Sequence, residues 1–594
     1  MFLRHRHFIA FACWVVLNSN LFAADAISDR YPVALEQTDD IVLVANGRTG
    51  SVSVLDKRSW AVTGERRIGE RIVDLVRVGN EFVAVDQNRN ELISLRIGKR
   101  IEVVNRISVA TSPVDIVFLA DRQLLSVTSL WARQLTILSR AGEGGQFEVR
   151  KVIDLPFAPL RQCAVPDRRH LIVADAFGGN LAVVDLETVT VRAIRTLQAH
   201  NIRGLAVSHD RKELLVAHQL MNEYVPTERA RVFWGTVMSN IFRAVPFRSL
   251  TSFGKDPDGQ SGVTSDDGIF RDGIHHWSLI PLGTSGDASG DPGQVSISTD
   301  GQCAVTLSGV DEVAVRSGPL SPFTRLHVQR RPTAVVIDSR RDVAIVANTL
   351  SSSLTIVDLK TKETTATISL GNKAESSAES RGESLFHDAR LSLDGWFSCQ
   401  SCHTEGHSNG LLNDNFGDDN SGAPKRVLTL LGASKTAPWS WNGSQLDLHE
   451  QIAKSVEKTM RGEIDKMPIK KHSADIAAYL QTLAPPPALD VARGRVDSRK
   501  VARGKKVFEA NSCNKCHQLP TYTSTKTYDV GLKDENGVRK FNPPSLISVS
   551  QRSSYFHDGR AKSLRAVFTE HGHLKGRNLT PQQQDDLLSF LGQL

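Results

Sequence analysis

The sequence of 594 residues contains no apolar run of roughly 20 residues, which is the length that a membrane-spanning helix needs. The apolar stretch 8–17 near the start is much shorter. It follows Arg4 and Arg6 and precedes the small-residue stretch 23–26, which offers an A-x-A cleavage site. These three features are typical of a secretion signal. We therefore predict a signal peptide at residues 1–26 and a periplasmic or secreted protein that does not span a membrane.

The sequence also lacks a cluster of lysines and arginines interleaved with aromatic residues. Its formal charge of +7 is spread thinly over a long chain. A nucleic-acid partner is therefore not expected, since such proteins concentrate their positive charge on one face. A mildly basic surface would instead suit an acidic redox partner.

Cysteine is scarce, with seven in the chain, and one of them lies in the predicted signal peptide. Four of the others form two C-x-x-C-H motifs. A zinc site would need a second ligand pair within about 12 to 20 residues, and a thioredoxin-type pair would not need the histidine. The spacing is that of c-type haem attachment, in which both thiols bond to the haem and the histidine binds its iron. The motif residues are Cys399, Cys402, His403, Cys513, Cys516 and His517.

We therefore predict two covalently bound c-type haems, with His403 and His517 as proximal iron ligands. Two cysteines remain, Cys163 and Cys303, and both lie in β-rich segments. We expect them to be buried, unreactive thiols, because free cysteine behaves as a small apolar residue.

A strand-turn-strand pattern recurs after residue 40, with successive starts about 40 to 47 residues apart, which is the period of four-stranded propeller blades. One interval is about twice as long and holds the Gly/Asp/Ser-rich stretch 254–291, which indicates a long loop. We predict seven blades over residues 27–370, with an eighth, degenerate blade as an alternative. The copies begin at Ile41, Glu81, Gln123, His170, Glu213, Gln302 and Val343. Units such as VANGRTGSVSVLD resemble YVTN-type β-propeller repeats.

Beyond residue 370 the alternation of strands ends. A small, polar stretch at 371–383 is predicted to be a linker. Helical patterns follow, at 446–459, 473–483 and 581–594. Arg381-Gly382 precedes the first haem motif as Arg503-Gly504 precedes the second, which indicates a duplication. The predicted architecture is multidomain: an all-β seven-bladed propeller followed by two all-α cytochrome c modules, at 384–485 and 486–594.

The C-terminal region resembles the bacterial dihaem cytochrome c peroxidase family, which includes the dihaem enzyme that matures tryptophan tryptophylquinone. The matching segments are LFHDARLS before the first motif, WNG with LHEQ after it, and YFHDG after the second motif; they begin at Leu385, Trp441, Leu448 and Tyr555.

The resemblance implies roles for three further residues. Trp441 falls where the family places an electron relay between the haems, although core packing is the alternative. Gln451 and Glu457 fall near the family's distal glutamine and catalytic glutamate. Gln451 aligns cleanly, whereas the spacing to Glu457 is shorter than in the family. A carboxylate there would serve O–O cleavage as an acid–base group.

The sixth ligands are less determined. His571 occupies the place of the family's distal methionine at the second haem, so it is the expected ligand, with His573 as the alternative. At the first haem, Met460, Met467, His407 and His449 are all candidates, and the sixth position is alternatively open. The family holds calcium between its modules by an asparagine, but Arg426 stands at the matching place, so calcium is doubtful.

We expect a secreted dihaem oxidoreductase of the peroxidase type. Electrons from a small redox protein, a cytochrome or cupredoxin, would enter at the second haem, and peroxide or a related oxidant would be reduced at the first. One alternative is an electron-transfer protein in which the propeller is a docking platform. Another is an oxidase that acts on an organic or protein substrate.

Overall fold

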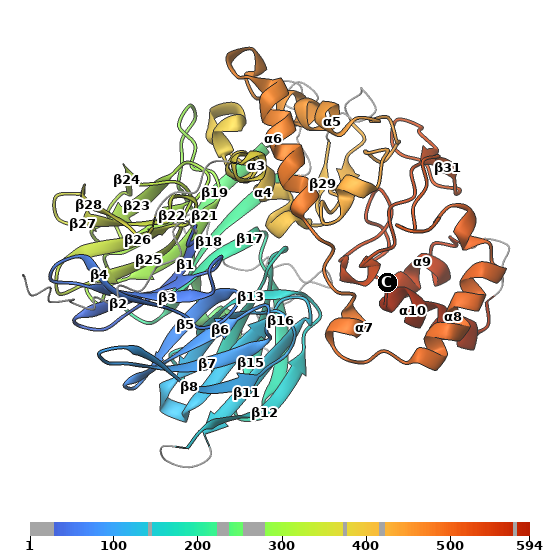
Figure 1. Cartoon of the computed structure of the whole chain (residues 1–594). Helices are drawn as coiled ribbons and strands as arrows, with labels where there is room; N and C mark the ends of the chain where they lie inside the picture. Colours follow the sequence, from blue (N-terminus) through green and yellow to red (C-terminus); the bar gives the residue numbers. More distant parts are fainter. Residues whose placement is uncertain are drawn as a thin grey trace, which may run out of the picture.

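The computed structural model describes residues 29–140, 145–222, 237–253, 279–371, 377–414, 422–573 and 579–594. The predicted signal peptide and most of the predicted long loop lie outside these ranges. None of the described helices is long and apolar enough to cross a membrane. Figure 1 shows a ring of sheets, coloured blue to yellow-green, beside an orange and red helical region.

The ring consists of seven four-stranded antiparallel sheets, which confirms the predicted seven-bladed propeller. No eighth blade is present among the described residues. The first four blades comprise β1 Pro32–Gln37, β2 Ile41–Asn46, β3 Ser51–Asp56, β4 Ala61–Arg67; β5 Ile72–Val78, β6 Glu81–Asp86, β7 Glu91–Ile97, β8 Ile101–Ser108; β9 Pro113–Leu119, β10 Leu124–Ser129, β11 Gln134–Arg140, β12 Phe147–Asp154; and β13 Pro159–Ala164, β14 His170–Asp175, β15 Asn180–Asp185, β16 Thr190–Thr196. The other three comprise β17 His200–Val207, β18 Glu213–Asn222, β19 Val237–Pro246, β20 Leu279–Pro281; β21 Pro292–Ile297, β22 Cys303–Leu307, β23 Glu312–Arg316, β24 Thr324–His327; and β25 Pro332–Asp338, β26 Val343–Asn348, β27 Ser353–Asp358, β28 Glu363–Ser369.

Each recurring sequence unit forms the middle strands of a blade, where β-branched residues are buried on both sides. A buried asparagine braces the hairpin in two of these units. Asn46 Nδ2 donates to Ser51 Oγ and Ser53 Oγ at 3.0 and 2.8 Å. Asn348 Nδ2 does the same to Ser353 Oγ and Thr355 Oγ1 at 3.2 and 2.9 Å. The repeat therefore carries the buried polar bonds that its turn requires.

The ring closes between the first and last blades. Lys57 Nζ lies 2.9 Å from Asp338 Oδ2 in a buried ion pair, and Gln37 Nε2 donates to the carbonyl of Ile337 at 2.8 Å. Cys163 and Cys303 are free and buried in blades four and six. Burial raises the pKa of each thiol to about 12, in keeping with the predicted unreactive thiols.

Short helices and turns form the C-terminal region. The first module contains α3 Ala378–Phe386, α4 Cys399–Cys402, α5 Leu448–Lys454 and α6 Ile469–Thr482, with the short strands β29 Leu412–Asn413 and β30 Lys425–Arg426. The second contains α7 Leu489–Ala492, α8 Ser498–Ala510, α9 Leu564–Thr569 and α10 Pro581–Gly592, with β31 Tyr528–Asp529 and β32 Lys540–Phe541. The last part of the predicted linker is helical, because Ser377 Oγ caps α3.

Each of the two modules contains an equivalent pair of packed helices. Arg381 forms a bidentate pair with Asp475 between α3 and α6, and Arg503 forms the same pair with Asp586 between α8 and α10. Beside each arginine a glycine lets the helices touch: a Cβ on Gly382 or Gly504 would lie 1.9 Å from the partner helix's carbonyl oxygen. These repeated contacts give the predicted duplication a structural basis.

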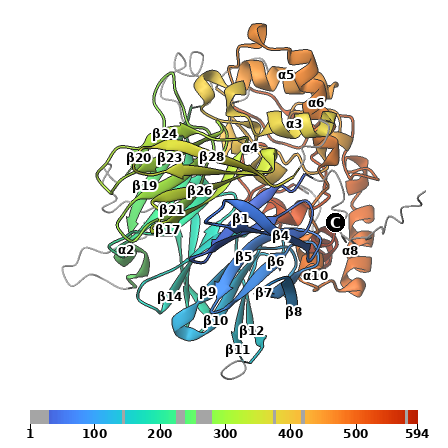
Figure 2. The same ribbon diagram turned by 60° about the vertical axis from the view of Figure 1, so that its left-hand side comes forward.

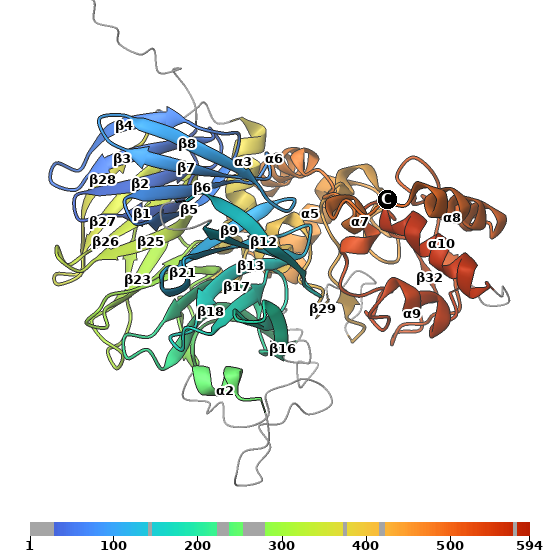
Figure 3. The ribbon, with the colours of Figure 1, turned by 90° about the horizontal axis from the view of Figure 1, so that it is seen from below.

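The first module packs on one face of the propeller, and the second lies farther out (Figures 1 and 3). In Figure 2, α3, α5 and α6 form one cluster, and α8 and α10 lie apart from it. The second module also reaches the propeller. Arg495 Nη1 lies 2.5 Å from Asp154 Oδ2, and Gln551 Nε2 donates to the carbonyl of Trp131 at 2.8 Å.

Candidate functional site

The first C-x-x-C-H motif is clamped by the propeller. Ser398 and Ser401 flank the first turn of α4 in a capping box, and both hydroxyls donate to the buried carboxylate of Asp291 at 2.5 Å. Asp291 precedes β21 at the end of the predicted long loop. Gln219 Nε2 of β18 also donates to Ser401 Oγ at 3.1 Å. The propeller therefore contacts the first C-x-x-C-H motif directly, and no local sequence pattern predicts this contact.

His403 is oriented for metal binding. Its Nδ1 lies 2.9 Å from the carbonyl oxygen of Leu428, which leaves Nε2 as the ligand atom. Burial lowers the pKa of His403 to about 4, so the imidazole is neutral, the form that binds iron. The ring lines a cavity of about 440 Å³ together with Cys399 and Cys402, and this volume is in the range of cofactor sites.

Three predicted residues line the same cavity. Trp441 is buried where the modules meet; its Nε1 donates to the carbonyl of Arg426 at 2.8 Å, and its ring lies edge-on to His557, with centroids 6.4 Å apart. Gln451 lines the wall, and its buried Oε1 has no hydrogen-bond partner among the described residues. Met460 is buried in the wall too. The cavity thus offers an apolar wall, an indole and an unused amide oxygen.

Two other predicted residues lie elsewhere. Glu457 is exposed and does not line the cavity, because six residues of helix turn it well away from the face of Gln451. His407 is buried, with Nδ1 3.0 Å from Thr429 Oγ1 and Nε2 3.2 Å from the carbonyl oxygen of Gln551. Since both ring nitrogens have protein partners and the ring lies outside the cavity wall, the proposed ligand role of His407 does not fit this structure.

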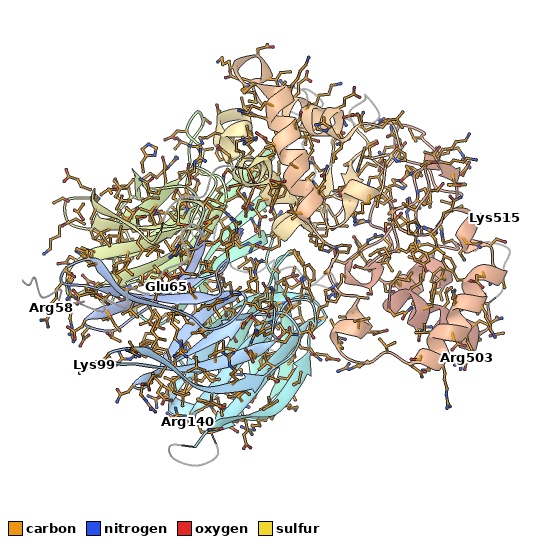
Figure 4. All side chains as sticks on the ribbon, in the orientation of Figure 1. Arg58, Glu65, Lys99, Arg140, Arg503 and Lys515 are labelled. Carbon is orange, nitrogen blue, oxygen red and sulfur yellow. The ribbon has the colours of Figure 1, made fainter. Side chains whose placement is uncertain are left out.

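The second motif is more open. Cys513 and Cys516 are half-buried, and the turn Cys513–Lys515 has no side-chain cap. Lys515 lies on the side of the molecule away from the propeller (Figure 4). His517 Nδ1 lies 3.1 Å from the carbonyl oxygen of Tyr522, which again leaves Nε2 for iron.

The histidines after α9 differ in their relation to His517. Burial lowers the pKa of His517 to about 4, and the nearby His573 contributes to this shift. His573 Nδ1 is buried and has no partner in the described part of the chain. The rings of His571 and His573 both pack on Phe556, with centroids 5.9 and 5.8 Å away. This arrangement favours His573 over His571 as the sixth ligand.

The place expected for calcium is cationic. Arg426 and Lys425 are both buried there, with exposed fractions of 4% and 7%. No group of three or more metal-ligating His, Cys, Asp or Glu side chains occurs among the described residues. Calcium needs oxygen ligands, usually including carboxylates, so the residues present do not fit it.

The fold and the two motifs define a dihaem cytochrome fused to a propeller. The family model for di-haem cytochrome c peroxidase matches residues 377–485 and 507–584. The cytochrome c551 peroxidase of Nitrosomonas europaea is 24% identical over 261 residues, covering 35% of this chain and 77% of that protein. The methylamine utilization protein MauG of Methylorubrum extorquens is 25% identical over 256 residues, covering 35% and 72%.

Among solved structures, the hydrazine synthase of Kuenenia stuttgartiensis covers 57% of this chain and 98% of its own, with 16% identity and a TM-score of 0.46. The sequence matches show that the C-terminal region is similar to peroxidase-like haem oxidoreductases, in agreement with the resemblance seen in its sequence motifs.

Proposed function

We propose that this chain is a dihaem c-type oxidoreductase whose first module reduces peroxide or a related oxidant with electrons that enter at the second module. The observation that carries this proposal is the contrast between the two motifs. The first motif has one buried cysteine and lines a largely apolar cavity that is partly open to solvent, whereas both cysteines of the second motif are half-buried. A shielded haem suits chemistry, and an exposed one suits exchange of electrons with a small redox protein, a cytochrome or cupredoxin.

Bound at the four cysteines, two covalent haems would supply the redox chemistry. The protein's own residues would hold the haems, orient their iron ligands and bind the oxidant. The carbonyls of Leu428 and Tyr522 fix the tautomers of His403 and His517. Trp441, held by its indole N–H, lies at the contact between the modules and is proposed as the electron relay. The free Oε1 of Gln451 would accept a hydrogen bond from a bound oxidant.

One observation favours a second candidate. Among the described residues of the cavity wall there is no carboxylate, so the acid–base group expected for O–O cleavage is missing. A site with both haems six-coordinate, Met460 closing the first, would transfer electrons only. A third possibility is an oxidase for an organic or protein substrate. We further propose that the protein is exported to the periplasm or secreted.

Low-temperature electron paramagnetic resonance of the holoprotein, fully oxidised and half-reduced, separates these functions. A high-spin ferric signal that hydrogen peroxide consumes is expected for a peroxidase-type site. Two low-spin signals in both states, unchanged by peroxide, would leave an electron-transfer protein. A high-spin signal that peroxide does not alter would point to a different oxidant or substrate.

A further inference from the structure

The charge of the cavity wall is one-sided. Four cationic side chains line it, and the described residues of the wall include no aspartate or glutamate. Two of these cations are accounted for: Lys425 Nζ lies 2.9 Å from Asp534 Oδ2, and Lys435 is exposed to solvent. The other two are Arg426 and Arg552.

Arg426 comes from β30 of the first module and is only 4% exposed. Its guanidinium donates to neutral acceptors, the carbonyls of Phe556 at 3.3 Å and of Val427 at 3.4 Å. It also lies over the ring of Trp441, with its central carbon 5.4 Å from the ring centroid. Its backbone N–H donates to the carbonyl of His557 at 2.6 Å. Arg426 is thus held firmly, yet within the described structure it has no carboxylate partner.

Arg552 follows the turn Val549–Gln551 of the second module. One of its guanidinium nitrogens donates to the carbonyl of Ser545, and it too has no ion pair with any described carboxylate. Burial, followed by repulsion from Arg552, lowers the pKa of Arg426 to about 9. Burial lowers the pKa of Arg552 to about 10. Both guanidinium groups line the same cavity, with Arg426 buried and Arg552 half-buried, so two positive charges lie in one poorly solvated wall.

A buried cation without a counter-charge is unfavourable, so a persistent pair of them indicates an anionic ligand. The ligand must also have a large apolar body, because phenylalanine, leucine and valine side chains form much of the same wall. A haem carries two carboxylates on an apolar ring. Guanidinium groups bind carboxylates through two parallel hydrogen bonds, which suits them to this task.

We propose that Arg426 and Arg552 bind the carboxylates of the haem attached at Cys399 and Cys402. This inference rests on the haem attachment assumed in the proposed function. Because Arg426 belongs to the first module and Arg552 to the second, one ligand would then be held from both sides. The two arginines would also supply the positive charge between the modules, so that calcium is not required there.

The test uses the holoprotein and the variants Arg426→Gln and Arg552→Gln, with Arg552→Lys as the conservative change. Arg539→Gln is the control, since Arg539 is exposed and pairs with Asp529 on the same module. Resonance Raman spectra report the bending mode of the haem carboxylate groups, and spectroelectrochemistry gives the midpoint potential of the first haem.

Each Gln variant should shift the carboxylate mode. It should also move the reduction equilibrium of the first haem about tenfold toward the ferric form, about 59 mV, because a nearby cation favours the reduced state. Arg552→Lys should keep the potential near that of the parent, and Arg539→Gln should change neither readout.

If folded Gln variants carry the haem and leave both readouts unchanged, the inference is wrong. Mass spectrometry of the peptide with Cys399 and Cys402 separates this from failure of the proposed function, which would appear as a parent protein without haem on that peptide. If Arg426→Gln does not fold, the comparison of Arg552→Gln with Arg552→Lys decides whether the arginines bind the haem carboxylates.

Discussion

The two cytochrome modules are built on the same helix pair, yet their haem motifs lie in different surroundings. In both, an arginine–aspartate pair and a glycine contact join the helices. In the first motif Cys402 is buried, Cys399 is half-buried, and the turn is capped and bonded to Asp291 of the propeller, whereas the second motif forms an uncapped turn in which both cysteines are half-buried. The shared helices build the module, and the neighbouring domain determines how its haem site is shielded. In the proposed function, the more shielded first site and the more open second site would take different tasks.

The helix contact itself should be the most sensitive element. Alanine at Gly382 or Gly504 would place a Cβ 1.9 Å from a backbone carbonyl oxygen. Alanine normally favours a helix over glycine by about 1 kcal/mol, but forced overpacking costs about 3 kcal/mol and should dominate. We expect each substitution to destabilise its own module, as measured by denaturant unfolding followed through the Soret band of each haem.

Gly64→Ala is the matched control. Gly64 lies on the outer strand β4, and a Cβ there would meet nothing within 4 Å. It should change the free energy of unfolding by only a few tenths of a kcal/mol. If alanine at Gly64, Gly382 and Gly504 changed the free energy of unfolding by similar amounts, Gly382 and Gly504 would not be sites of close helix contact. The main argument for an equivalent helix pair in the two modules would then fail.

The propeller clamp should affect only the first motif. Asp291→Asn keeps the shape of the side chain but replaces one acceptor oxygen by a donor, so one of the two serine hydroxyls loses its partner. A hydrogen bond to a charged group contributes about 2 kcal/mol. We expect a loss of this size in unfolding monitored at the first haem, together with a change in its electron paramagnetic resonance signal.

Asp529→Asn, an exposed change in the second module, should leave both haem signals unaltered. Equal changes at the two haems in Asp291→Asn would contradict a clamp specific to the first motif. They would instead indicate that the contact with the propeller affects the two modules equally.

The repeats and the haem motifs were accessible from the sequence because both are local patterns. Strand periodicity predicted the seven blades, and the C-x-x-C-H spacing predicts the haem attachment residues. The clamp was not accessible, since Asp291 is more than 100 residues from Ser398 and lies at the end of the predicted long loop. Glu457 and His407 lie outside the cavity wall for a different reason. A position close in sequence to a site residue does not determine on which face of a helix a side chain lies or which hydrogen bonds it forms.

The open motif offers a test of ligand identity. If His573 is the sixth ligand of the second haem, His573→Met should raise the potential of that haem, because Met/His ligation favours the reduced state. We expect the equilibrium to shift at least about tenfold, about 1.4 kcal/mol. Potentiometry and the electron paramagnetic resonance signal of the second haem are the readouts. His571→Met should change little, and the reverse pattern would assign the ligand to His571.

The link between the modules should show the smallest change in stability. Trp441→Phe keeps an aromatic ring but removes the indole N–H that donates to Arg426 at 2.8 Å, a loss of about 1 kcal/mol. Trp439→Phe is closely matched, because its Nε1 donates to the carbonyl of Ala433 at 3.0 Å and it lines the same cavity. Both variants should lose similar stability. Only Trp441→Phe should slow electron transfer between the modules, as stopped-flow spectroscopy after reduction at the second haem would measure. If the two variants transfer electrons at the same rate, Trp441 is a packing residue and the contact between the modules needs no aromatic relay.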